Sequence, residues 1–177
     1  MKPTADLIQE HGIIKLAIRI LDKINEKIKS GKTVKDDDLN KMIVFIREFA
    51  DKCHHGKEEE YLFPEMLKSG ISEEKTVIGN LLDEHKEGRK FVKDMAESIG
   101  RRDYARFAES AEKYARLLDR HIDKENTIMF RMADKSLSIE KQNKIEEGFE
   151  DIEENRIGEG RHKELLDLAM ELRKSYL

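Results

Sequence analysis

The chain has 177 residues, of which 41% are charged and 38% hydrophobic, with two prolines and no tryptophan. This length suits one domain with a sizeable core, and the high charge with few helix-breaking residues favours long helices with polar faces over a β-rich fold. The formal charge of −4 arises from 34 basic and 38 acidic residues that are interleaved along the chain, so we expect no nucleic-acid surface.

Apolar residues recur at helical steps in four successive stretches. The first begins at Pro3 and ends at Gly31, and the second runs from the acidic residues 36–38 to Gly70, with Pro64 expected to bend its last turn. Two further helices are predicted beyond them.

The third stretch begins after Ser72 and ends at Gly100, and the fourth runs from near Asp103 through Met132. A less regular fifth stretch extends toward the C-terminus and is interrupted at residues 158–160, which is compatible with two short helices.

Four helices of about 25 to 30 residues joined by short turns predict an all-α fold. We expect an antiparallel up-down-up-down four-helix bundle over residues 1–135, with residues 136–177 as a C-terminal helical extension packed on it. Residues 7–11 match residues 81–85, so the chain is predicted to consist of two helical hairpins with pseudo-twofold repetition.

Histidine and glutamate four residues apart occur on both the second and the fourth helix, a spacing that puts both side chains on one face. The first and third helices each carry a histidine within an apolar stripe. In an antiparallel bundle these groups fall at the same end and converge on one polar layer. The six expected members are His11, His54, Glu58, His85, His121 and Glu125.

Six such groups in an apolar core need a strong common partner, because burying them unpaired is costly. Two metal ions supply one, and four imidazoles with two carboxylates suit iron, manganese or zinc, with the redox-active first two favoured. Each element alone has a plainer interpretation, a surface salt bridge or a hydrogen-bonded core histidine. Two copies together favour the metal site.

The sequence resembles the hemerythrin-like, HHE cation-binding family over about residues 7 to 132. The resemblance rests on Glu10-His11, His54-x-x-x-Glu58 followed by Tyr61-Leu62-Phe63-Pro64, Glu84-His85, and His121-x-x-x-Glu125. It implies a four-helix bundle around an oxo- or hydroxo-bridged pair of iron ions, with the four histidines as terminal ligands and the two glutamates as bridges.

Two departures from the family pattern bear on function. Leu81 occupies the position of a fifth histidine of oxygen carriers, and Glu125 stands at a spacing of four where those proteins have an aspartate at five. The resemblance therefore implies more open metal positions and disfavours simple oxygen carriage. His162 is a candidate replacement ligand or, alternatively, a solvated histidine at a helix start.

The sequence leaves the roles of several side chains near the predicted ligands undecided. We expect His55 and Glu59 toward the rim, contacting the ligands from outside. The two glutamates that precede His11 and His85 diverge from them by about 100° and are expected to be solvated. Tyr61 and Tyr114 are either hydrogen-bond donors to a bound oxygen species or helix-edge aromatics.

These features predict a non-haem di-iron protein that binds O2 or a related small diatomic or peroxide, more a binding protein for sensing, storage or iron handling than a dedicated enzyme. One alternative is a di-iron enzyme acting on peroxide, nitric oxide or ferrous iron. Another is a helical interaction module regulated by metal. Because no apolar run approaches about 20 residues, we expect a cytoplasmic protein without a membrane partner.

Overall fold

A computed structural model of the chain describes residues 2–73 and 76–177. Its first helix, α1 (Pro3–Lys29), has a proline in its first turn, where a missing backbone N–H breaks no helical hydrogen bond. The helix ends before Gly31, whose φ of 74° reverses the chain at little steric cost. Both limits agree with the sequence prediction.

Residues 36–68 form one continuous helical rod in which α-helical and π-helical turns alternate. Its named parts are α2 (Asp36–Phe45), η1 (Ile46–His55), η2 (Glu58–Leu62) and α3 (Phe63–Lys68). Pro64 lies in the first turn of α3, where the absence of its N–H is tolerated. The wide turns η1 and η2 cover the predicted site residues of this rod, His54, His55, Glu58 and Glu59.

The next two rods are joined by a tight turn. Helix α4 (Ile78–Gly100) leads to α5 (Tyr104–Lys124), which continues through η3 (Glu125–Met129) into α6 (Phe130–Ser136). The Asp103 carboxylate accepts the backbone N–H of Arg106 at 3.0 Å and caps α5. Because the connection between them is short, α4 and α5 pack along each other.

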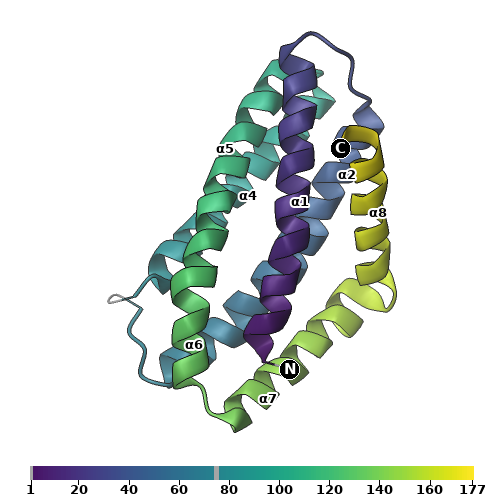
Figure 1. The fold of residues 1–177 in the computed structure, drawn as a ribbon. Helices are drawn as coiled ribbons and strands as arrows, with labels where there is room; N and C mark the ends of the chain where they lie inside the picture. Colours follow the sequence, from purple (N-terminus) through teal and green to yellow (C-terminus); the bar gives the residue numbers. More distant parts are fainter. Residues whose placement is uncertain (1, 74–75) are drawn as a thin grey trace.

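The C-terminal stretch forms two helices, as its interruption suggested. Helix α7 (Ile139–Asp151) continues into η4 (Ile152–Gly158), and α8 (Arg161–Tyr176) follows. Gly158 and Gly160 have φ of 110° and 78°, which allows the reversal between them. In Figure 1, α7 crosses one end of the molecule and α8 runs back beside α1 and α2.

The prediction of an all-α fold is confirmed, because the described residues contain helices and no strand and the helices pack as a bundle (Figure 1). The up-down-up-down order and the boundary between residues 1–135 and 136–177 stay predictions. None of the described helices is long and apolar enough to cross a membrane.

Two apolar clusters flank the polar layer that the sequence predicted. The larger one includes Ile14, Phe49 and Leu118, and the smaller one includes Leu7 and Phe63. Along each rod, the predicted site residues lie between the members of these two clusters. The layer is therefore held between close-packed apolar regions, which fix its side chains in place.

The contact between α7 and the bundle depends on Gly148, which packs flat against the ring of Tyr61. A Cβ at this position would lie 2.2 Å from Tyr61 Cδ1. We therefore expect Gly148→Ala to lower the free energy of unfolding by about 1–3 kcal/mol, measured by urea denaturation. Gly12→Ala in α1 is the matched control, since nothing lies within 4 Å of its added Cβ, and it should stabilise by up to about 1 kcal/mol. Equal midpoints for the two variants would contradict this packing.

Candidate metal centre

Four imidazoles meet as two close pairs in the polar layer. His11 on α1 faces His54 on η1, with 2.9 Å between their Nε2 atoms. His85 on α4 faces His121 on α5, with 3.0 Å between theirs. All four side chains are buried. The structure thus brings together the histidines that the sequence placed in one layer.

Each of these histidines donates its Nδ1–H to an oxygen from another helix, at 2.7 or 2.8 Å. The pairs are His11 with Asn126, His54 with Glu10, His85 with Glu59, and His121 with Glu84. A neutral imidazole that donates from Nδ1 carries a lone pair on Nε2. When both members of a pair are neutral, two lone pairs face each other, an arrangement that a shared cation stabilises and that is typical of metal-ligating histidines.

Two fully buried carboxylates lie between the histidine pairs. One oxygen of Glu58 lies 3.6 Å from His54 Nε2 in the first pair, and its other oxygen lies 3.4 Å from His85 Nε2 in the second. Glu125 likewise reaches both pairs, with 3.1 Å to His11 Nε2 and 3.0 Å to His121 Nε2. None of the four oxygens has a hydrogen bond of acceptable geometry. Because a buried carboxylate without a partner is costly, these donors fit a pair of bound cations.

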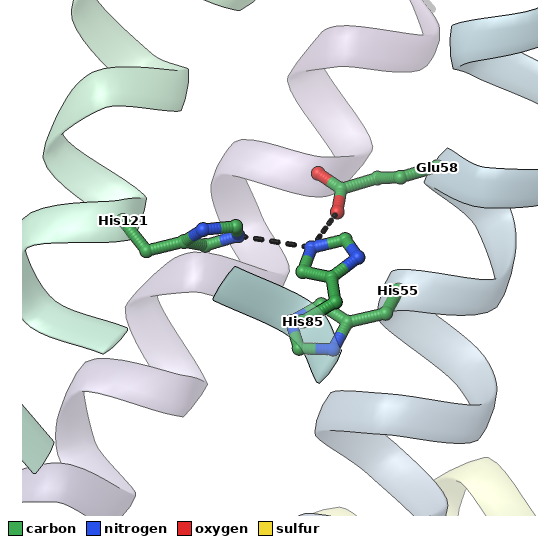
Figure 2. Close-up of side chains that lie close together, drawn as sticks. All are labelled: His55, Glu58, His85 and His121. Carbon is green, nitrogen blue, oxygen red and sulfur yellow. Dashed lines mark hydrogen bonds and ion pairs between the residues drawn. The ribbon is translucent and has the colours of Figure 1, made fainter. Parts of the chain in front are cut away.

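The candidate ligand atoms form two groups that share Glu58. One group comprises His11, His54, Glu58 and Glu125, and the other comprises His55, Glu58, His85 and His121, with all ligand atoms of a group within 4.8 Å of one another. Figure 2 shows Glu58 and His121 pointing toward His85 in the second group. The layer can therefore accommodate two ions side by side.

Burial and neighbouring charges leave some candidate ligands of the layer deprotonated at neutral pH and keep others protonated. Burial lowers the pKa of His54 to about 4, so this imidazole is neutral at pH 7. Burial opposes the charged form of His121 too, but the carboxylates of Glu125 and Glu84 raise its pKa to about 9. Burial, together with the nearby Glu125, raises the pKa of Glu58 well above its usual value. Metal binding at neutral pH must therefore release protons.

His55 is the main correction to the sequence prediction. It was expected toward the rim, but it is 5% exposed and its ring stacks on His85 with 3.8 Å between the centroids (Figure 2). His55 lies in the π-helical turn η1, whose i→i+5 hydrogen bonds shift the helical phase from the one that α-helical spacing predicts. Its Nδ1 lies 3.3 Å from Asp51. Glu59 contacts His85 from outside, as expected.

His162, the candidate additional ligand, joins neither group at the centre. Its ring lies 5.2 Å from that of Phe49, and its Nε2 lies 3.8 Å from Glu10. Leu81, at the position of the missing histidine, is buried in the smaller apolar cluster. The additional imidazole near the centre is therefore His55.

A third convergence of possible ligands, beside α8, has a different character. Glu10, Cys53, Glu153 and His162 approach one another there, but the buried ammonium of Lys57 lies 2.5 Å from Glu10 and also contacts Glu153. Lys57 thus supplies the positive charge itself. Burial raises the pKa of Cys53 to about 12 and keeps it a thiol. This group is a buried ion-pair network.

The partners of the histidines were the part of the site that sequence reasoning missed. Glu10 and Glu84 were expected to be solvated, yet each accepts from a histidine on the neighbouring rod. No role was predicted for Asn126, which accepts from His11. A signal was present in the repeat, because residues 57–59 and 124–126 both read Lys-Glu followed by a side chain with an acceptor oxygen. Lys57 donates to Glu10, and Lys124 donates to Glu84 in the same way.

Comparisons with known proteins agree with this geometry. Residues 2–133 match the family model described as the Hemerythrin HHE cation binding domain. The chain is 25% identical over 176 residues to the uncharacterized protein Mb2018 of Mycobacterium bovis and, equally, to the uncharacterized protein Rv1995 of Mycobacterium tuberculosis. Each alignment covers 96% of this chain and 68% of the relative. No solved structure matches significantly.

Proposed function

The chain belongs to the hemerythrin HHE cation-binding family, and from that premise we propose that it holds a pair of iron ions and binds O2 or a related small molecule there. The observation that carries the proposal is a set of four buried carboxylate oxygens that have no hydrogen bond and that lie 3.0 to 3.6 Å from four imidazole Nε2 atoms. Nitrogen and oxygen donors in this number suit iron, and manganese or zinc are the alternatives.

The roles we propose follow the contacts of each side chain. The members of each histidine pair would hold the ions, and Glu58 and Glu125 would be shared between them, because each carboxylate reaches both pairs. His55 is a further donor on the side of His85. The acceptors on the Nδ1 atoms hold each ring in its ligating tautomer and orientation.

Iron in this layer would supply the capacity to exchange electrons with a small ligand, and the protein would supply a dry, preorganised environment. The two apolar clusters restrict water around the layer, which strengthens electrostatic interactions within it. The proposed roles are oxygen or redox sensing, storage or iron handling, in the cytoplasm.

The test is anaerobic loading with ferrous iron followed by exposure to air. We expect two iron ions per chain by metal analysis and new charge-transfer absorption on exposure. His121→Ala should lower the iron content, while Arg120→Ala, next to it and outside both ligand groups, should not. Two bound irons without any spectral change in air would exclude oxygen binding and leave metal binding intact.

A second candidate is an enzyme that acts on peroxide at the same centre. It is favoured by a cavity of about 110 Å³ that borders His55, His85 and His121 and gives a small substrate access to them. Steady peroxide consumption by the iron-loaded protein, abolished by His121→Ala, would support the enzyme. A single stoichiometric reaction without turnover would support the binding protein.

A further inference from the structure

The last helix leaves an open groove along the first one. Helix α8 runs beside α1 (Figure 1), and a groove of about 530 Å³ lies along their junction. It is lined by two residues of α1 and by four residues from the second half of α8 and its C-cap: Leu16, Arg19, Met170, Arg173, Lys174 and Leu177. None of these residues belongs to either ligand group of the metal centre.

Apolar side chains from both helices line this groove. Met170 and Leu177 are seven residues apart, so they share one face of α8 at a distance of two helical turns. The backbone N–H of Leu177 donates to the carbonyl of Arg173 at 2.8 Å, which continues the helical turn to Leu177. Leu177 is 48% exposed, and Leu16 and Met170 are half-buried. An apolar surface with a polar rim is typical of an interaction site.

The rim of the groove is positively charged. Arg19, Arg173 and Lys174 are exposed, and the lining contains no acidic residue, although the chain as a whole carries a formal charge of −4. Three like charges around an apolar surface raise the local concentration of an oppositely charged partner. The groove therefore favours an acidic ligand.

The acidic residues next to these cations on the same helices are bound elsewhere. Asp22, one turn after Arg19, pairs with Arg116 at 2.6 Å. Glu171, between the groove residues of α8, pairs with Lys41 at 2.7 Å. The positive charge of the rim is therefore not neutralised by its own helices, and it remains available to a partner.

Two helices side by side, with an apolar floor and a basic rim, fit a third helix. Ridges of side chains on one helix pack into the grooves of another, and an amphipathic helix binds a groove through apolar side chains at i, i+3, i+4 and i+7. Carboxylates beside those apolar positions would meet Arg19 on one side and Arg173 on the other. Such charge pairs contribute mainly specificity and association rate.

Two other occupants fit the groove less well. A flat lipid surface would contact the exposed basic side chains but could not reach the half-buried Leu16 and Met170 between them. A second copy of the chain would need a helix with two exposed apolar side chains on one face. The exposed large apolar side chains of the described residues lie in four different segments: Ile8, Ile128, Ile139 and Leu177.

We propose that the groove between α1 and α8 is a docking site for an acidic amphipathic helix of a partner protein. Leu16, Met170 and Leu177 receive the apolar stripe of that helix, and the three basic residues of the rim pair with its carboxylates. The groove is separate from the metal centre. This inference therefore goes beyond the proposed function, and neither one depends on the other.

The test is fluorescence anisotropy of a labelled synthetic peptide titrated with the full chain. The peptide is a helix of about four turns with leucine at i, i+3, i+4 and i+7 and glutamate at the flanking positions. We expect saturable binding that weakens as the ionic strength rises. Arg19→Glu and Arg173→Glu should each weaken the affinity by about tenfold, because each replaces an attraction with a repulsion. Leu177→Ser should weaken it by about threefold to tenfold, because an apolar contact is lost.

Matched controls come from the same chain. Lys90→Glu in α4 is the control for the charge reversals, since Lys90 is exposed and lies outside the groove lining. Ile8→Ser in α1 is the control for Leu177→Ser, since Ile8 is 45% exposed and also lies outside the lining. Both controls should bind the peptide like the natural protein. A peptide of the same composition whose leucines do not share a face should bind about tenfold more weakly.

The outcomes separate the docking site from its rivals and from the metal centre. Equal affinities of the natural protein and the groove variants, or of the ordered and the scrambled peptide, would overturn the docking site. Binding to vesicles of phosphatidylglycerol that Arg173→Glu abolishes, without peptide binding, would assign the groove to a lipid surface instead. A dimer in sedimentation equilibrium that Arg173→Glu dissociates would assign it to a second copy. Metal content enters none of these measurements, so their failure leaves the metal centre standing.

Discussion

Glu58→Gln is expected to lose metal while the metal-free protein stays folded. Glu58 belongs to both ligand groups, so its loss affects both ions, and we expect the metal content to fall from two ions per chain to one or fewer. The amide has the shape of a protonated carboxyl group, so the apolar surroundings remain packed. Metal analysis after loading and gel filtration measures the effect.

In the metal-free protein, Glu58→Gln is expected to raise the free energy of unfolding at neutral pH. Burial and the neighbouring Glu125 raise the pKa of Glu58 well above its usual value, so the folded state holds a proton that the unfolded state releases above about pH 4.5. Stability therefore falls as pH rises above that value, by up to about 1.4 kcal/mol per pH unit. Glu58→Gln should remove this fall and be at least as stable as the natural protein at pH 7.

Glu60→Gln is the control for both measurements, since Glu60 is exposed and its carboxylate pairs with Arg156. It should keep both metal ions and the pH dependence of the natural protein, measured by urea unfolding after chelator treatment. Glu58→Gln with full metal content would contradict the bridging role. A steeper loss of metal-free stability with pH in Glu58→Gln would contradict the raised pKa.

The rods of the fold could be predicted because each carries a long apolar stripe bounded by strong end signals. Helix α1 begins at Pro3 and ends before Gly31, and α4 ends at Gly100, as the pattern indicated. The six predicted ligands share a layer because helix phase and antiparallel height follow from spacing alone. Periodicity at 3.6 residues per turn was sufficient for these features.

The positions that spacing could not predict depend on wide turns and on contacts between rods. An α-helical phase turns His55 about 100° away from His54, and the π-helical turn η1, which spacing does not predict, changes that phase. Glu10 and Glu84 point away from their sequence neighbours and reach histidines on another rod. The path of α8, which keeps His162 from the centre, depends on packing that no local pattern encodes.

Lys57→Met is expected to destabilise the protein by about 3–5 kcal/mol, because it removes one partner of a buried ion pair and leaves the other charged. Lys57 is 1% exposed, and its Nζ lies 2.5 Å from Glu10 and contacts Glu153 on η4. The hydrogen bond from His54 and the charge of Lys57 hold the pKa of Glu10 well below its usual value although burial opposes this. Urea denaturation measures the loss.

The internal repeat supplies the control. Lys124 contacts Glu84 as Lys57 contacts Glu10, but its side chain is 30% exposed and that of Glu84 is 15% exposed. Water can therefore solvate the remaining carboxylate, and Lys124→Met should cost no more than about 1 kcal/mol. Equal losses for the two lysine variants would show that burial of the pair is not what makes Lys57 important.

Adding Glu10→Gln to Lys57→Met should restore at least half of the lost stability, since the double variant no longer buries an unpaired charge. The glutamine oxygen can still accept the Nδ1–H of His54, so the double variant should keep its metal. Lys57→Met alone leaves a full negative charge 2.8 Å from that nitrogen. Recovered stability with lost metal would mean that His54 requires a charged acceptor, and that the C-terminal helices affect the centre through Glu153, Lys57 and Glu10.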